Sequence, residues 1–262
     1  MKYNKIILFF GFALPVSMIL RFLQLFYIVE SDTGFFKQEF NNYGYYIMAV
    51  IFAFTAATAV FSFFSHRSPE HPPTVNIGLS LSSFALAVSI VVELFLGGAE
   101  FGTIIWQTIL LRVFGIASAV WFAAFSIKDF MNLRIPAISF SIPTVYFVLK
   151  IICSFAGISS LALISDNILL IGANCVSLLF MLNFAKLYNN IDTERGFRKL
   201  LASGLASVIL CFTQSVPNIV FHFSTEGGYL HTAMVTNFNV LFTGIFIVAF
   251  VFSHFSHSNA CE

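Results

Sequence analysis

Three basic residues stand inside apolar stretches of this chain, where a charge is costly. Arg21, Arg112 and Lys150 each interrupt an apolar run that is long enough to cross a bilayer. An arginine keeps its charge at any pH that a protein meets, and hydrocarbon solvates charge poorly. Such cations are stabilised by a carboxylate, a phosphate or a water-filled cavity. The residues therefore suggest a site that binds a small anionic or zwitterionic solute, or a lipid headgroup.

Other polar side chains occur on the same apolar runs. Glu93 balances one of the three basic groups, which leaves an excess of positive charge. Several amides would then orient a ligand through hydrogen bonds. The predicted ligand-binding residues are Arg21, Gln24, Glu93, Arg112, Lys150, Asn174, Gln214 and Asn239.

The same residues have a purely structural interpretation. Small residues three and four apart let membrane helices approach closely, and amides form hydrogen bonds between helices. A salt-bridge and hydrogen-bond network that only stabilises the bundle is therefore the alternative to a binding cavity. The sequence leaves both interpretations open.

Catalytic and metal-binding patterns are not found in the sequence. It has no phosphate-binding glycine loop and no G-x-S-x-G turn. His66, Glu70 and His71 lie among prolines, which preclude the regular helix of a zinc motif. We interpret these residues, and the histidines of the C-terminal tail, as parts of solvated segments. We expect no catalytic residue, no metal and no cofactor.

The composition indicates how these residues are held. The chain has 262 residues, of which 58% are hydrophobic and 10% charged. Soluble domains carry about 25% charged residues, so the chain is expected to be an all-α, polytopic integral membrane helix bundle. We predict one membrane domain, residues 1–262, with the lipid bilayer as its main partner. A formal net charge of +1 gives no reason to expect a nucleic acid.

Eight transmembrane helices are predicted from apolar runs of about 20 residues. Ser165 and Asp166 are interpreted as a cap for the sixth helix, because their oxygens can accept from its first N–H groups. The least certain boundary separates the fifth and sixth helices. The predicted helices cover residues 6–29, 43–65, 75–97, 103–126, 137–160, 166–188, 200–221 and 232–254.

The distribution of basic residues predicts the orientation. With the N-terminus inside, nine of the 13 Lys and Arg residues fall in cytoplasmic segments and only Lys37 falls in an outer loop. Both termini are therefore predicted to be cytoplasmic, in a multi-pass protein of the cell membrane. The polar residues then gather in the outer half of the helices. We expect them to line one basic cavity that opens outward.

A duplication is a further hypothesis. Adding 129 to position 21 gives position 150, so Arg21 and Lys150 would be equivalent in two four-helix halves. The halves 1–131 and 132–262 would form a parallel 4+4 repeat, as in some transporters. The outer segment Glu30–Phe40 would rest at the membrane interface, or alternatively act as an acidic lid.

Three functions are consistent with these patterns. The first is binding and transport of a small anionic or zwitterionic solute. The second is a membrane sensor or accessory subunit that signals through a partner chain, and the third is an intramembrane enzyme that modifies lipids. A protein partner or a homo-oligomer is compatible with each.

Overall fold

The structure is a computed structural model in which every regular element is a helix, within the part of the chain that it describes. An isolated antiparallel bridge joins Val29 and Phe36. The described residues are 3–30, 35–65, 76–97, 105–128, 130–131, 133–157, 165–189, 191, 196–224 and 233–260.

The described part of the chain contains eight α-helices, and each is in a segment that is long and apolar enough to cross a membrane. The prediction of eight such helices is confirmed, and α2 gains an additional turn at its start from a 3₁₀ segment. The helices are α1 (Tyr3–Leu23), α2 (Asn41–Ser65), α3 (Ile77–Leu96), α4 (Ile105–Ile127), α5 (Ile142–Gly157), α6 (Ser165–Tyr188), α7 (Gly196–Ser224) and α8 (Met234–Ala260). Three short helices accompany them, the π-helix η1 (Gln24–Ile28) and the 3₁₀ helices η2 (Gln38–Phe40) and η3 (Ala137–Ser141).

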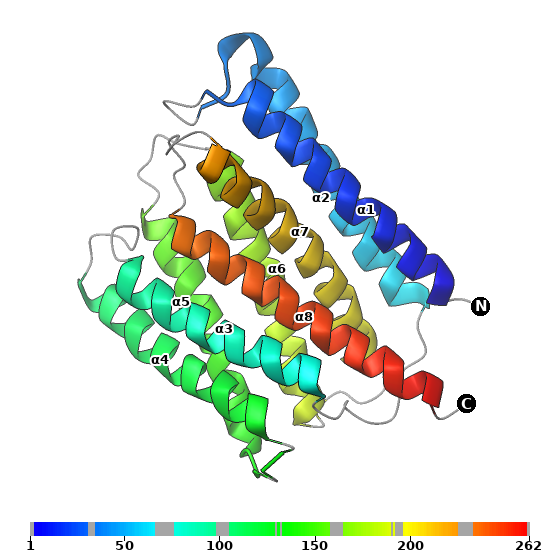
Figure 1. The fold of residues 1–262 in the computed structure, drawn as a ribbon, viewed down its shortest axis with the longest axis vertical. Helices are drawn as coiled ribbons and strands as arrows, with labels where there is room; N and C mark the ends of the chain where they lie inside the picture. The colour runs from blue at the N-terminus through cyan, green and yellow to red at the C-terminus, as the bar shows by residue number, and fades with distance from the viewer. Residues whose placement is uncertain are drawn as a thin grey trace.

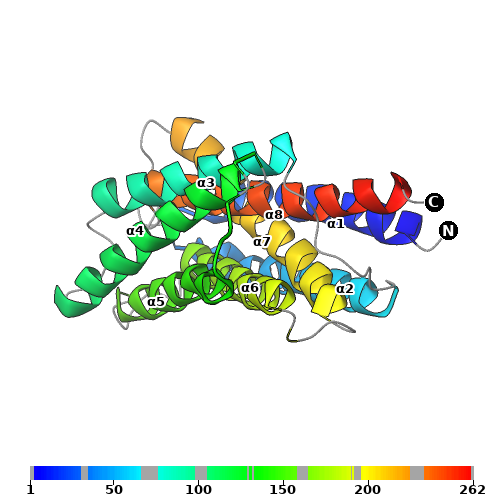
Figure 2. The ribbon, with the colours of Figure 1, turned by 90° about the horizontal axis from the view of Figure 1, so that it is seen from below.

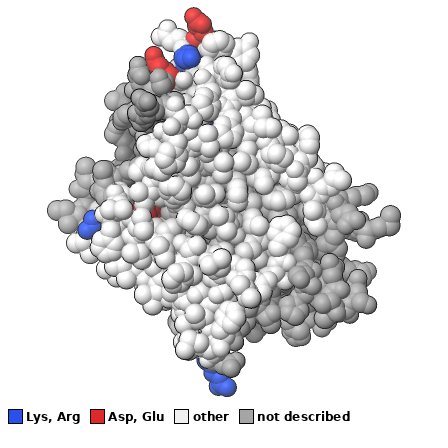
Figure 3. All heavy atoms as spheres, viewed as in Figure 1, with Lys and Arg blue, Asp and Glu red and all other residues white. Residues whose placement is uncertain are grey.

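The surface of the bundle is apolar. Large side chains such as Leu8, Phe64 and Phe95 are each more than 70% exposed. Charged side chains are sparse over the described surface in Figure 3 and lie mainly toward its edges. In water the hydrophobic effect favours burial of large apolar side chains. A surface that exposes many of them is therefore compatible with a protein that is surrounded by lipid.

The helices form two layers around one central helix. Figure 2 shows α1, α3 and α8 on one side and α2, α5 and α6 on the other, with α7 running obliquely between them. α7 packs against α1, α2, α6 and α8, and α4 connects the layers by packing against α3 and α5. The two chain ends lie close together at one end of the bundle (Figure 1). We call the opposite end, where α1 and α7 end, the distal end.

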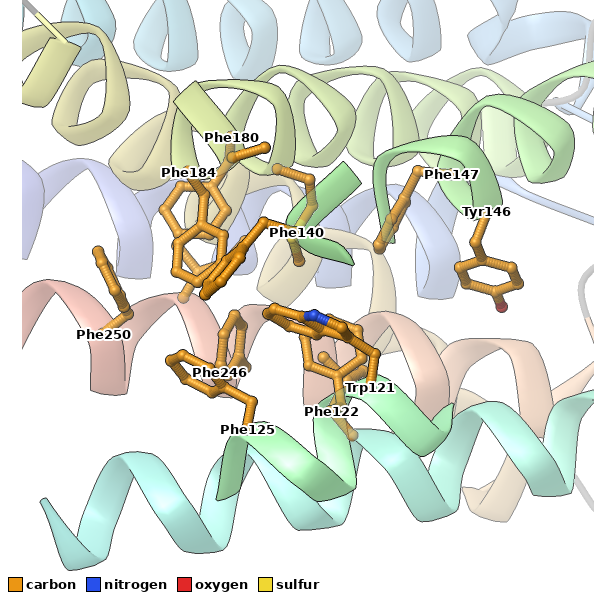
Figure 4. Packing of buried hydrophobic residues seen from close by; sticks show 14 of the residues in the cluster. Trp121, Phe122, Phe125, Phe140, Tyr146, Phe147, Phe180, Phe184, Phe246 and Phe250 are labelled. Carbon is orange, nitrogen blue, oxygen red and sulfur yellow. The ribbon is translucent and has the colours of Figure 1, made fainter. Parts of the chain in front are cut away.

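An aromatic cluster fills the interior between α4, α5, α6 and α8 (Figure 4). Phe184 is fully buried, and its ring contacts those of Trp121, Phe125 and Phe250 at centroid distances of 6.0, 5.7 and 5.1 Å. Burial of such rings stabilises a fold through close packing, in addition to the favourable geometry of ring pairs. Tyr146 lies at the margin of the cluster, where the interior becomes polar.

Helix packing gives no support to the repeat. In a parallel 4+4 repeat α1 would correspond to α5, and α3 to α7. Among the described residues α1 packs closely on α2 and α7, whereas the most extensive helix packing of α5 is with α4 and α6. The duplication, the single domain and the cytoplasmic termini all remain predictions.

Candidate functional site

Arg21 and Asp166 form an ion pair that is shielded from the surface. The Arg21 side chain is fully buried, and its Nη2 lies 3.2 Å from Asp166 Oδ1. Arg21 Nη1 also donates to Gln24 Oε1 over 2.6 Å. Arginine cannot lose its proton here, so the carboxylate of α6 is what balances the charge of α1.

The Asp166 carboxylate accepts hydrogen bonds from other side chains besides Arg21. Its Oδ1 atom accepts from Gln214 Nε2 over 2.6 Å and from Asn218 Nδ2. Asn218 Nδ2 lies 3.3 Å from Asn237 Oδ1 on α8. A buried carboxylate needs several donors to replace its lost water, and the amides of α7 supply them. We call Arg21, Gln24, Asp166, Gln214, Asn218 and Asn237 the Arg21 network.

Two backbone features lie beside this network, a π-helix after α1 and a proline within α7. α1 continues directly into the π-helix η1, whose first residue is Gln24. In α7, Pro217 lies between Gln214 and Asn218 and has no N–H for the carbonyl of Thr213. π turns are frequent at functional sites, and a proline inside a helix leaves one backbone carbonyl without its usual donor.

Gln24 connects the network to α2 through a glycine. Its Nε2 donates to the carbonyl oxygen of Gly44 over 2.9 Å. A Cβ at position 44 would come within 2.7 Å of the Phe36 ring. A side chain at this position would therefore displace Phe36, and glycine allows the close approach.

A short hairpin covers the distal side of the Arg21 network. Glu30 N donates to Phe35 O over 2.8 Å, and Lys37 N donates to Ile28 O over 2.9 Å. The hairpin seats Phe36 against the buried residues Leu25, Val29 and Phe221. The distal side of the Arg21 network is thus covered by apolar side chains. Residues 31–34 lie outside the described part of the chain, and Glu39 is exposed.

A second ion pair joins α3 and α5. Lys150 Nζ lies 2.8 Å from Glu93 Oε1 and 2.9 Å from Oε2, and both side chains are buried. The hydroxyl of Tyr146 donates to Glu93 Oε2 over 3.0 Å. Lys150 Nζ also donates to Asn239 Oδ1 on α8 over 3.2 Å. We call Glu93, Tyr146, Lys150 and Asn239 the Lys150 network.

Hydrogen-bonding capacity is left over on the helices of the Arg21 network. Ser17 Oγ, Asn174 Nδ2 and Gln214 Oε1 are buried and have no hydrogen-bond partner among the residues that the structure describes. Ser17 precedes Arg21 by one turn of α1, and Gln214 precedes Asn218 by one turn of α7. Buried polar atoms are nearly always satisfied in native proteins. These atoms can therefore interact with a ligand or with water.

The structure does not bring the three predicted cations together in one hydrogen-bonded network. Arg21 and Lys150 belong to two networks, and each is paired with a carboxylate from another helix. Arg112 belongs to neither network, because it lies on the exposed face of α4 beside Ile109 and Val113. The excess of positive charge that was expected in the interior is therefore absent from both networks.

The other predicted residues are distributed between the networks. Gln24 and Gln214 join Arg21, and Glu93 and Asn239 join Lys150. Asn174 is buried on α6, about two turns beyond Asp166, and belongs to neither network. The role of these residues in binding a ligand remains a prediction.

Sequence reasoning missed Asp166, Tyr146, Asn218 and Asn237 as members of these networks. Asp166 was interpreted as a helix cap because it begins an apolar run, yet its side chain accepts from α1 and α7. The signal in the sequence that could have identified Asp166 was its negative charge at the edge of an apolar run. A carboxylate at the edge of an apolar run can reach the interior as well as the interface.

No candidate metal site is found among the described residues. The described residues contain no group of three or more His, Cys, Asp and Glu that could hold a metal ion. His66, Glu70 and His71 lie outside the described residues.

Comparison of the chain with family models, with curated proteins and with solved structures finds no match.

Proposed function

We propose that this chain is a multi-pass membrane protein that binds and transports a small zwitterionic solute, and that the Arg21 network is its binding site. The supporting observation is the buried Arg21–Asp166 pair, which is surrounded by amides and adjoins the π-helix after α1 and the proline within α7. A ligand carboxylate would bind Arg21, and a ligand ammonium would bind Asp166.

The charge balance favours a zwitterion over an anion. A lone anion that displaced Asp166 from Arg21 would leave a buried carboxylate without its partner, which is strongly unfavourable. A solute that carries both charges replaces both partners at once. The amides Gln24, Gln214 and Asn218 then supply donors and acceptors for either group.

Transport requires the site to open at each membrane face, and two features support this part of the proposal. The hairpin that carries Phe36 covers the distal side through one aromatic ring and two backbone hydrogen bonds. The Lys150 network provides a second buried pair whose exchange of partners could accompany a movement of α8. Polar pairs at membrane depth mark ion and solute pathways in many transporters.

The first test measures binding to the purified protein. Glycine, γ-aminobutyrate and betaine are compared with acetate and methylammonium, which carry one charge each. We expect at least one zwitterion to raise the thermal unfolding temperature, because a ligand at 100 times its Kd stabilises by about 2.7 kcal/mol. The single-charge compounds should have no such effect. Stabilisation by acetate alone would contradict the proposal.

The second test measures uptake into liposomes. A zwitterion that stabilises the protein should enter protein-containing vesicles faster than empty ones. Asn183→Leu serves as the matched control, because Asn183 is an amide on α6 whose Nδ2 donates to Ser203 Oγ on α7, outside both networks. Gln214→Leu removes a donor to Asp166 and should reduce uptake more strongly than the control. Binding without uptake would limit the function to sensing.

A further inference from the structure

Arg112 is a cation on the lipid-facing surface of the bundle. It is exposed on α4, and its exposed neighbours on the same helix include Ile109, Val113 and Ile116. Neither of the ion pairs formed among the described residues includes Arg112. Since hydrocarbon provides no counter-charge, a guanidinium in this position favours an anion from the surrounding lipid.

The position of Arg112 along α4 points to the distal headgroup layer. α4 begins at the distal end, and Trp106 is 59% exposed near its start. Exposed Tyr27, Tyr43 and Tyr46 lie near the same end on η1 and α2, as expected for an aromatic belt at a membrane interface. Arg112 lies six residues beyond Trp106, or about 9 Å along the helix.

The direction of the side chain agrees with this position. Side chains on an α-helix lean toward its N-terminus, which for α4 is the nearer membrane surface. Long basic side chains use this lean to bring the charge to the headgroups while their methylenes stay in hydrocarbon. Thr108 lies one turn nearer the distal end on the same helical face and has a hydroxyl that can donate.

We infer that Arg112 and Thr108 form a binding site for the phosphate of an anionic lipid in the leaflet at the distal end. Guanidinium binds phosphate through two parallel hydrogen bonds, which gives both strength and orientation. A second copy of this chain is a poorer occupant. The carboxylates within the described spans, Glu93 and Asp166, are buried, so a symmetric contact here would oppose two arginines.

The experiment uses the full-length protein in nanodiscs of phosphatidylcholine with increasing fractions of phosphatidylglycerol. Native mass spectrometry counts retained lipids, and thermal unfolding reports stabilisation. We expect phosphatidylglycerol to bind the wild type at least about tenfold more tightly than Arg112→Gln. Arg112→Lys should restore part of the loss, because it keeps the charge without the bidentate geometry.

Lys37→Gln is the matched control. Lys37 is an exposed cation at the same end of the bundle, and its backbone hydrogen bond to Ile28 does not involve the side chain. This variant should bind phosphatidylglycerol as the wild type does. Equal affinity of wild type and Arg112→Gln would overturn the inference, as would inorganic phosphate displacing the lipid effect. A protein that co-purifies in a manner dependent on Arg112 would equally overturn it, because a partner carboxylate would then be the counter-charge.

Discussion

Asn237 and Asn239 stand two residues apart on α8 and accept hydrogen bonds in two different ion-pair networks. Asn237 Oδ1 lies 3.3 Å from Asn218 Nδ2, and Asn239 Oδ1 lies 3.2 Å from Lys150 Nζ. Two residues turn an α-helix by about 200°, so the two amides face opposite sides. α8 is therefore a common wall of the two networks, and a shift of this helix would alter the hydrogen bonds of both.

Removal of the Tyr146 hydroxyl should weaken the Lys150 network without breaking its ion pair. In Tyr146→Phe, Glu93 Oε2 loses the 3.0 Å hydrogen bond and keeps Lys150. We expect a loss of about 1 to 1.5 kcal/mol in unfolding free energy, measured by chemical denaturation in detergent. Tyr46→Phe is the control, because Tyr46 is 67% exposed. Equal stability of the two variants would refute the role of the hydroxyl.

Substitution of Gly44 should loosen the hairpin over the Arg21 network. In Gly44→Ala, the new methyl group must displace the Phe36 ring, which lies 2.7 Å from a Cβ built at this position. We expect faster hydrogen exchange at the amides of Glu30 and Lys37, whose hydrogen bonds close the hairpin. The exchange is measured by mass spectrometry.

Gly11→Ala is the comparison for this experiment. A Cβ at Gly11 meets nothing within 4 Å, and alanine has the higher helix propensity. Exchange in the hairpin should match the wild type in this variant. If Gly44→Ala also leaves hairpin exchange unchanged, Phe36 does not hold the segment in position.

The aromatic cluster should dominate the stability of the bundle. Phe184→Ala removes a fully buried ring that packs against several others, so we expect a loss of about 3 to 5 kcal/mol. Phe95→Ala removes a ring that is 71% exposed on α3 and should change stability by less than about 1 kcal/mol. Unfolding in mixed micelles measures both. Similar losses would mean that the interior is not packed as described.

The helices could be predicted from sequence because membrane physics constrains them strongly. A span needs about 20 apolar residues, and polar loops must separate the spans. The predicted sixth span, residues 166–188, matches the observed span Asp166–Tyr188 at both ends. The turn at Gln38–Phe40 was missed because Gln38 and Glu39 are polar, so the continuous apolar run begins only after them.

The partners of each cation could not be predicted in the same way. Arg112 was predicted to line an interior cavity, and Thr108 and Gly115 share its helical face at spacings of four and three residues. Which face of a membrane helix points inward depends on the neighbouring helices, and a single sequence does not contain that information. Asp166 illustrates the same limit, because its pairing with Arg21 joins residues 145 positions apart.

The central claim is that the Arg21–Asp166 pair binds a ligand in addition to holding helices together. The variant Arg21→Met/Asp166→Leu tests it, because exchange of a whole buried pair for apolar residues of similar volume is often neutral for stability. Either single substitution should instead cost about 3 to 5 kcal/mol. Thermal unfolding of this double variant with and without the stabilising zwitterion is the decisive measurement. We predict that the double variant folds, with a lower stability because Gln214 and Asn218 lose their acceptor, and that the zwitterion does not stabilise it. Undiminished stabilisation by the zwitterion would contradict the account.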